Sequence, residues 1–492
     1  MPNEIELKLR IAAADVLRLR RHRALKQHLV SKPITRKLTS IYYDTPDLKL
    51  LDTAISLRVR RMSGNWFQAI KGAGYSLAGL HQRMEWEDII AKGEPDFSKI
   101  TEPGLTKIFD LQSLRDALKP VFITEVNRTE WQLQYEDGSA IEVALDLGEL
   151  QVGKQREDIS EIELELKHGE EKHLFELALA LQADIPLHIE NVSKAQRGYA
   201  YYRTSPLTTS KSQPIALSAK TKVVEAFQQI AWECLRQLQG NHDMALHGDE
   251  SEGVHQMHIG LRRLRVALKL FKHQSDELET ELGWLSELLG NARDWDVLLR
   301  KTLPAANVSS YEIETLAEKA QKRAYISLRT ALSSQRYQRL LLSLGAWLES
   351  DYQSPHKTLS SFAHKKLRKV FEKLCQHKNL SGLSPEQRHK VRIAVKNMRY
   401  STDFFAALCK NKKLMRKQQD FLGKLSHLQK LMGVMNDIAT TEKLLAQLTG
   451  KQSTANILEA VEVLAKWNAT RLAEADKTLT SSWHALLQAA PY

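Results

Sequence analysis

Close to the start of the chain stands the stretch Glu4-Ile5-Glu6-Leu7-Lys8-Leu9-Arg10-Ile11, in which charged and apolar side chains alternate without a fault. A period of two is typical of a β-strand, because successive side chains point to opposite faces of the sheet. Two carboxylates and an ammonium therefore share one face, roughly 6.5–7 Å apart along the strand. The stretch predicts a strand with one charged face and one apolar face.

Two later stretches repeat the alternation, the first with bases and the second with acids. They are Ile55-Ser56-Leu57-Arg58-Val59-Arg60 and Glu161-Ile162-Glu163-Leu164-Glu165-Leu166-Lys167. For one strand, a solvated outer face is the ordinary explanation. Three such strands favour a closed sheet with apolar side chains outside and charges in the lumen. Because unpaired buried ions cost several kcal/mol each, such acids would bind Mg²⁺ or Mn²⁺ and such bases would hold phosphate oxygens.

The chain divides at a polar linker that ends near Pro214. Alternating, strand-like patterns precede it, and amphipathic helical runs such as 223–238, 254–271 and 457–476 follow it. At 492 residues the chain is too long for a single core. We expect an α+β protein with a sheet domain over 1–203, a linker over 204–217 and an all-α bundle over 218–485.

Charge is distributed unevenly between these parts. Residues 1–205 hold 29 basic and 31 acidic side chains, whereas the remainder holds 42 basic and 28 acidic ones. Such a basic surface favours polyanionic partners. No stretch has the length and apolarity of a membrane span or a secretory signal, and three scattered cysteines suit a reducing compartment. The sequence predicts a cytoplasmic protein with no membrane partner.

The helical half repeats itself at a constant offset of 134 residues, which indicates an internal duplication. A lone histidine on a helix is most often a packing or surface residue, but a histidine followed by two bases recurs in both copies. If the two helices face each other, their bases form an anion-binding groove. Nucleic acid is the second choice as its ligand, because the repeats lack interleaved aromatic residues for base stacking. The groove residues are His255, Arg262, Arg265, His389, Arg392, Lys396 and Arg399.

Residues 1–203 resemble the CYTH superfamily, the triphosphate tunnel metalloenzymes. The hallmark of this family is an initial Glu-x-Glu-x-Lys, which Glu4, Glu6 and Lys8 match here. The ordered supporting motifs are Tyr42-Tyr43-Asp44-Thr45, Leu57-Arg58-Val59-Arg60, Lys71, Arg83-Met84-Glu85, Arg128, Asp146, Glu163-Leu164-Glu165, Ser193-Lys194 and Arg197-Gly198-Tyr199. The resemblance implies an eight-stranded antiparallel β-barrel tunnel whose substrates carry a triphosphate.

The resemblance also implies roles for individual residues. Catalysis is expected to depend on Glu6 and Lys8. Divalent metal is expected at Glu4, Glu6, Asp146, Glu163 and Glu165, with Glu161 as an alternative member because it shares their strand face. The phosphates are expected at Lys8, Arg58, Arg60, Lys71, Arg83, Arg128 and Lys194.

Residues 218–485 resemble the CHAD domain, which implies binding of inorganic polyphosphate; His258 departs from the arginine that is common there. The whole chain therefore resembles bacterial CYTH–CHAD inorganic triphosphatases. We expect metal-dependent hydrolysis of inorganic triphosphate to diphosphate and phosphate. The alternatives are cyclisation of ATP as by a class IV-type adenylyl cyclase, hydrolysis of thiamine triphosphate, and a non-catalytic polyphosphate-binding scaffold.

Overall fold

The computed structural model describes residues 3–204, 206–248, 251–273, 275–308, 310–350, 358–377, 380, 383–449 and 454–489. The chain forms two compact units. The first, the barrel unit, comprises Met1–Pro206 and Ser333–Ser350, and the second, the helical unit, comprises Leu207–Leu332 and Asp351–Tyr492. Among the described residues every helix is too short or too polar to cross a lipid bilayer.

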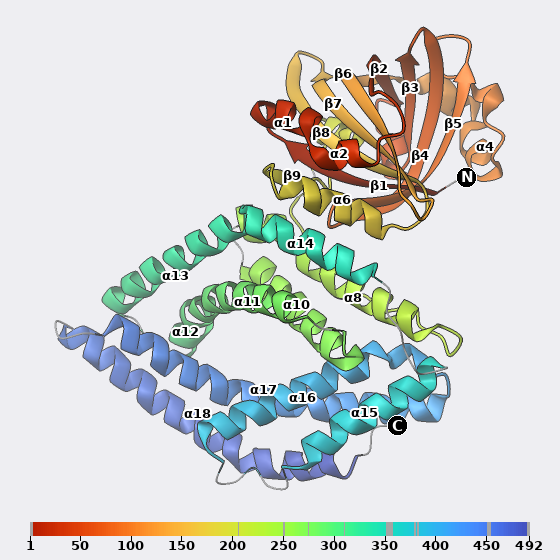
Figure 1. Ribbon diagram of the computed structural model, residues 1–492. Helices are drawn as coiled ribbons and strands as arrows, with labels where there is room; N and C mark the ends of the chain where they lie inside the picture. Colours follow the sequence, from red (N-terminus) through yellow and green to blue (C-terminus); the bar gives the residue numbers. More distant parts are fainter. Residues whose placement is uncertain are drawn as a thin grey trace. The chain divides into compact units, whose positions relative to one another are not determined.

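The barrel unit is built on one antiparallel sheet that closes on itself (Figure 1). The strand order is β5-β4-β3-β2-β6-β7-β8-β1, and pairing of β1 with β5 closes the eight-stranded barrel, while short β9 adds to the other end of β1. This confirms the expected tunnel fold. The strands are β1 (Asn3–Ile11), β2 (Ile34–Asp44), β3 (Ser56–Met62), β4 (Asn65–Leu77), β5 (Leu80–Ile90), β6 (Lys119–Gln134), β7 (Ala140–Val152), β8 (Gln155–His168) and β9 (Leu187–Ile189).

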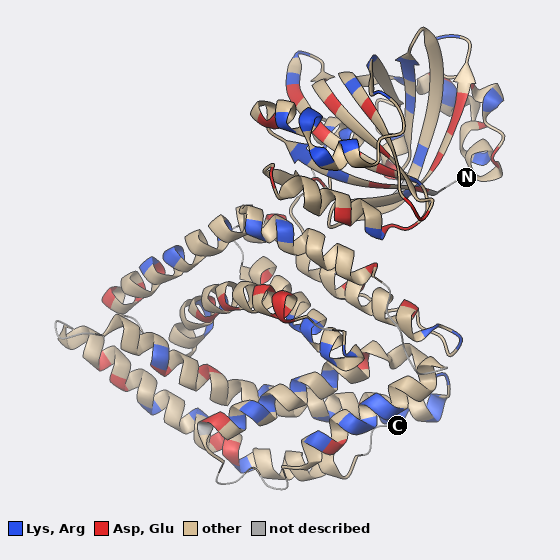
Figure 2. Cartoon of the chain, viewed as in Figure 1, with Lys and Arg blue, Asp and Glu red and all other residues tan. Residues whose placement is uncertain are grey.

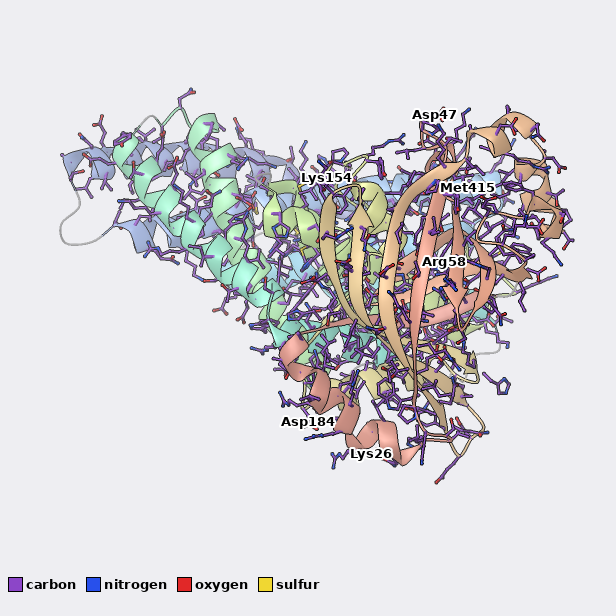
Figure 3. The ribbon with its side chains drawn as sticks, turned by 90° about the horizontal axis from the view of Figure 1, so that it is seen from above. Lys26, Asp47, Arg58, Lys154, Asp184 and Met415 are labelled. Carbon is purple, nitrogen blue, oxygen red and sulfur yellow. The ribbon has the colours of Figure 1, made fainter. Side chains whose placement is uncertain are left out.

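The apolar faces of the strands pack outward, which inverts the usual arrangement of a barrel. Leu7, Leu57 and Leu164 are fully buried on that outer side, because helices cover it and exclude water. The helices of this part of the chain are α1 (Val16–Arg21), α2 (Arg23–Gln27), α3 (Lys49–Asp52), α4 (Pro103–Phe109), α5 (Gln112–Ala117), α6 (Lys172–Gln182) and α7 (Lys194–Ala200), and the start of α7 lines the lumen. In Figure 3, Arg58 lies within the curved sheet, whereas Lys26 and Asp184 lie outside it.

The helical unit contains two copies of a helical motif that pack on each other. Helix α10 contacts α16, and α11 contacts α17. The rings of Phe271 and Phe405, which occupy equivalent positions in the repeat, have centroids 6.2 Å apart. The helices are α8 (Val223–Gln239), α9 (His242–His247), α10 (Ser251–Phe271), α11 (Asp276–Val297), α12 (Leu303–Ala305), α13 (Tyr311–Leu332), α15 (Leu359–Cys375), α16 (Pro385–Phe404), α17 (Lys412–Leu448) and α18 (Ala455–Leu487).

One helix of the second half packs with the barrel unit. Helix α14 (Gln335–Leu348) contacts α6 and β9 and belongs to the first unit. The division of the chain is therefore discontinuous in sequence, with a short segment of the second half completing the first unit.

Candidate functional site

Strand register brings the charged faces together inside the barrel. In the pairing of β1 with β8, Glu6 lies opposite Glu165 and Lys8 lies opposite Glu163. In the pairing of β1 with β5, Glu4 lies opposite Arg83. A single strand thus carries acids and a base to the seam between two other charged strands, because each strand alternates with a period of two.

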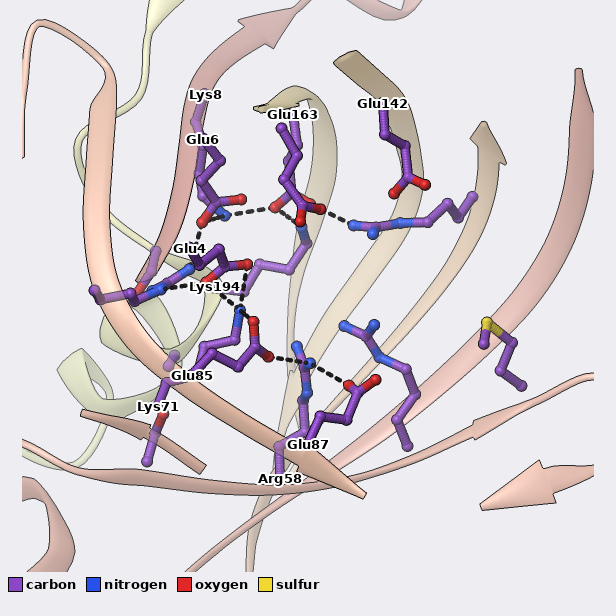
Figure 4. A pocket seen from close by; sticks show the side chains of 18 of the residues that line it. Glu4, Glu6, Lys8, Arg58, Lys71, Glu85, Glu87, Glu142, Glu163 and Lys194 are labelled. Atoms are coloured by element: carbon purple, nitrogen blue, oxygen red, sulfur yellow. Dashed lines mark hydrogen bonds and ion pairs between the residues drawn. The ribbon is translucent and has the colours of Figure 1, made fainter. Parts of the chain in front are cut away.

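These side chains surround one cavity of about 670 Å³ (Figure 4). Eight glutamates and nine lysines or arginines line it, so the charges nearly balance in the substrate-free lumen. Glu161 and Asp146 lie deeper in the wall and are 1% exposed. The lining residues expected from the sequence are Glu4, Glu6, Lys8, Arg58, Arg60, Lys71, Arg83, Arg128, Glu163, Glu165 and Lys194.

At the β1 side of the cavity, carboxylates and bases neutralise one another. Arg83 bridges Glu4 and Glu6, at 3.0 Å through Nε and 2.5 Å through Nη2. Lys8 Nζ lies 2.5 Å from Glu163 Oε1 and 3.2 Å from Glu6 Oε1. Lys71 Nζ lies 2.8 Å from both oxygens of Glu4. Removing one of these charges leaves its partners with fewer opposite charges in a low-dielectric site.

A second acidic group lies on β7 and on β8, the neighbour of β1. Carboxylate oxygens of Asp146, Glu161 and Glu163 come within 4.8 Å of one another. Arg128 grips Asp146 with two hydrogen bonds of 2.7 and 2.6 Å, and Lys194 contacts all three acids. Oxygen donors at this spacing suit a hard divalent cation such as Mg²⁺ or Mn²⁺. The buried acidic cluster therefore fits a metal ion.

The three acids of β8 occupy different environments. Glu163 contacts Lys8, Arg128 and Lys194 at the centre of the cluster. Glu161 is bonded to Lys194 and lies outside the cavity lining. Glu165 lies toward the rim, where its Oε1 is 2.7 Å from Lys167 Nζ. Glu163 is thus shared by both acidic groups, whereas its two neighbours on the strand are not.

On the β3 side of the cavity one arginine has no anionic partner among the described residues. Arg60 forms no ion pair among the described residues, and its Nε donates to Ser40 Oγ at 3.2 Å. Burial and the nearby charges of Arg58 and Arg128 lower the pKa of Arg60 to about 10. The buried Nε of Arg58 has no hydrogen-bond partner in the described part of the chain. Unmet donors under mutual repulsion are what an anion would satisfy.

The charges in the lumen also shift the pKa values of Tyr42 and Lys8. Burial alone would raise the pKa of Tyr42, but the positive charges of Arg58 and Arg60 outweigh it and lower the pKa. Burial likewise opposes the charged form of Lys8, yet Glu163 and Glu6 raise the pKa of its ammonium. Lys8 is therefore protonated at neutral pH and acts as a cation in the substrate-free site, not as a base.

Several lining residues were given no role in the sequence analysis, although Glu85 stood in one of the quoted motifs. Glu85 and Glu87 pair with Arg58 at 3.4 and 3.7 Å. Arg36 pairs with Glu130 at 2.5 Å. A signal existed for the first two, because Arg83, Glu85 and Glu87 alternate along β5 like the three charged stretches. The others lie on strands whose pattern is mixed.

In the helical unit, α10 and α16 bring bases from both repeats together (Figure 2). Arg262 contacts the ring of His258. Burial and the charges of Arg262 and Arg392 lower the pKa of Lys396 to about 6. Burial, Arg262 and Lys396 lower the pKa of His258 to about 3. His258 is therefore neutral at pH 7 and Lys396 is largely so, because the neighbouring arginines disfavour further positive charge.

The expected groove residues do not all join this cluster equally. Arg265 is turned to Glu279, with its Nε 3.2 Å from Oε1. Arg399 stacks on the ring of Tyr400 at 4.6 Å and adds its charge to the field at Lys396. Arg392 and Arg399 each keep a buried Nε without a hydrogen-bond partner among the described residues. The remaining expected members flank the cluster: His255 lies beside Arg262, and His389 lies beside Arg392.

Comparison with known proteins identifies both parts of the chain. Residues 2–199 match the CYTH domain profile and residues 229–446 match the CHAD domain profile. A protein of Haemophilus influenzae named inorganic triphosphatase is 33% identical over 201 residues, which cover 40% of this chain and 55% of that protein. The chain thus spans about half the length of this relative. The crystal structure of the CHAD domain from the plant Ricinus communis is 32% identical, with a TM-score of 0.50, and the match covers 57% of this chain and 97% of that one.

Proposed function

The chain combines a CYTH domain with a CHAD domain, and from this premise we propose that it hydrolyses inorganic triphosphate to diphosphate and phosphate with the help of Mg²⁺ or Mn²⁺. The observation that carries the proposal is that sites for an anion and for a cation lie side by side in the barrel. Arg60 has no ion pair among the described residues and the Nε of Arg58 has no hydrogen-bond partner among them, while three buried acids lie close enough together to share a cation. The Haemophilus influenzae relative named inorganic triphosphatase supports the same substrate.

A metal–triphosphate complex would replace the internal ion pairs of the lumen with equivalent ones. Phosphate oxygens would take over the guanidinium and ammonium groups that now contact glutamates. The acids released, Glu4, Glu6, Asp146, Glu163 and Glu165, with Glu161 as the alternative, would hold the metal. The bases are Lys8, Arg58, Arg60, Lys71, Arg83, Arg128 and Lys194. Because all of these residues except Lys194, which begins α7, are held by strands, little backbone reorganisation accompanies binding.

The chemistry follows from neutralising the substrate's charge. A triphosphate repels a nucleophile until its oxygens are paired with cations, and the cationic side chains of β3, β6 and β1 supply that pairing. A bound divalent metal would supply further neutralisation and lower the pKa of an attacking water. The protonated Lys8, 2.5 Å from Glu163, is placed to hold a phosphate oxygen while that carboxylate holds metal.

The test is phosphate release from inorganic triphosphate, ATP and thiamine triphosphate, measured side by side with Mg²⁺ and with Mn²⁺. We expect the fastest release from inorganic triphosphate and none in EDTA, with recovery when metal is restored. Cyclic AMP and diphosphate from ATP would instead identify a cyclase, and preference for thiamine triphosphate would identify that hydrolase. No turnover of any of them would leave a binding scaffold.

For the helical unit we propose binding of inorganic polyphosphate at the cluster of His258, Arg262, Arg392 and Lys396. The support is that burial and mutual repulsion lower the pKa of both Lys396 and Arg392, and that the Nε of Arg392 has no hydrogen-bond partner among the described residues. Replacing Arg262 and Lys396 together by methionine should weaken binding far more than replacing two exposed bases of α17. Equal losses, or tighter binding of single-stranded RNA of matched charge at the same ionic strength, would reduce the cluster to a generic basic surface. The control bases are Lys412 and Lys413.

A further inference from the structure

Helix α14 is encoded within the helical half of the sequence, yet it packs closely on the barrel unit. Its Gly345 lies against α6 so tightly that a Cβ atom there would come 2.2 Å from the ring of Phe175. Phe175 is fully buried by this packing. The residues that line the tunnel cavity all precede residue 200, so nothing in the site itself requires this helix.

The same helix covers the free edge of β9. The N–H group of Leu187 donates to Gln335 Oε1 at 3.1 Å, and the N–H group of Ile189 donates to Gln338 Oε1 at 2.9 Å. Residues three apart on a helix lie on one face, and residues two apart on a strand direct their N–H groups to one side. The two glutamines therefore accept hydrogen bonds from the edge of β9, in the place that a further β-strand would otherwise occupy.

The opposite edge of β9 holds the strand that carries the site. Leu9 lies opposite Ile189 in the pairing of β1 with β9. The N–H group of Glu190, directly after β9, donates to the carbonyl oxygen of Lys8 at 2.9 Å, and the N–H group of Lys8 donates to Gly79 O at 2.8 Å. The backbone of Lys8 is thus fixed on this side by β9 and by the turn that precedes β5.

We propose that Gln335 and Gln338 are positioning residues for the tunnel: α14 holds β9, and β9 holds Lys8 against Glu163. The inference rests on the proposed triphosphatase function. It makes α14 a part of the catalytic unit, although the helix supplies no group to the cavity. Small displacements of a strand that carries reacting groups cost large factors in rate, so the helix is expected to act on turnover.

The test uses the full chain, with Gln335→Met and Gln338→Met combined. Methionine keeps the volume but cannot accept the two N–H groups. We expect about tenfold faster amide exchange at Leu187, Ile189 and Glu190, with faster exchange also at the paired residues Leu9 to Ile11 of β1, and about a fivefold to tenfold fall in kcat with Mg²⁺-triphosphate. Arg339→Ala, on the exposed side of the same helix, should change neither. If the double variant does not fold, Gln335→Met alone tests the same contacts with a smaller effect.

Two results would overturn the proposal. One is wild-type kcat in a folded double variant, even if that variant melts at a lower temperature than the wild type. The other is faster exchange confined to β9 with no change at Leu9 to Ile11, which would make α14 a merely structural cover. Because exchange needs no turnover, inactivity of the wild-type chain toward triphosphate would refute the proposed function while the exchange data still decide the coupling.

Discussion

Two arginines of the tunnel, Arg60 and Arg128, are expected to affect folding stability in opposite directions when each is replaced by methionine. Arg128 forms two hydrogen bonds with Asp146 and contacts Glu163. Its removal leaves buried carboxylates short of a partner, which costs about 3 kcal/mol, at the lower end of the usual range. The cost stays at that end because Lys194 still pairs with both acids.

Replacement of Arg60 is expected to raise folding stability, because Arg60 pairs with no carboxylate that its removal would leave without a partner. Its pKa falls from 12.5 to about 10 in the folded protein, and this drop corresponds to about 3 kcal/mol of free energy needed to keep the guanidinium charged. Because Arg60 is only partly buried, solvent screening reduces the expected cost to about 1 kcal/mol. Arg60→Met should therefore raise the free energy of unfolding by about that amount.

Urea unfolding at pH 7.5 measures both free energies, and phosphate release from triphosphate measures kcat/KM. Both variants should lose about two orders of magnitude in kcat/KM, as removal of a charged transition-state clamp does elsewhere. The reasoning is refuted if Arg60→Met destabilises the protein as much as Arg128→Met does. Near-normal kcat/KM for Arg60→Met would show that Arg60 does not bind a phosphate of the substrate.

Three further outcomes follow from the same charges. Glu163→Gln should abolish metal-supported turnover. Three surrounding cations hold the pKa of Glu163 well below its usual range against the effect of burial, so the variant should also lose the stability that the wild type has above pH 4.5 and loses as the pH falls. Equal acid unfolding of the two proteins would contradict this. The pKa of Lys396 is about 6 in the free helical unit, and bound polyphosphate should raise this pKa, so that binding near pH 8 takes up about one proton. Calorimetry in two buffers of different ionisation enthalpy measures the proton uptake. The variant Lys396→Met should show none. Burial and Glu349 raise the pKa of Glu171 to about 7. The contribution of Glu171 to the free energy of unfolding is therefore full below about pH 4.5 and falls by about 1 kcal/mol as the pH rises through 7, after allowance for exposure. Glu171→Gln should flatten this pH dependence in unfolding titrations, and an unchanged slope would mean that other groups cause it.

Most of the candidate tunnel site could be predicted from local pattern, because a strand's period of two commits its charged side chains to one face. The stretches around Glu4, Arg58 and Glu163 each carry that pattern, and the structure brings all three to one cavity. The pairing partners could not be predicted in the same way. That Arg83 bridges Glu4 and Glu6, while Arg60 bridges nothing among the described side chains, depends on register and side-chain reach.

The expected repeats of the helical half show the same limit. The offset between the two copies locates matching bases, and α10 and α16 do pack on each other. Yet Arg265 turns to Glu279, whereas Lys396 is buried among cations and its pKa falls. A sequence pattern selects a helix face, but burial and neighbouring charges decide which members of that face remain available to a ligand.

By itself, the sequence determined the strands with one charged face and the helical duplication, because both appear as periodicities along the chain, whereas the closed eight-stranded tunnel was expected from the resemblance to the CYTH superfamily. It also determined which residue types could meet a metal and a phosphate. Only the tertiary structure decided that α14 completes the barrel unit through Gln335 and Gln338. No local pattern marks such a helix, because its partners lie far away in the chain and become neighbours only on folding. These partners are an open strand edge about 150 residues away and the ring of Phe175, about 170 residues away.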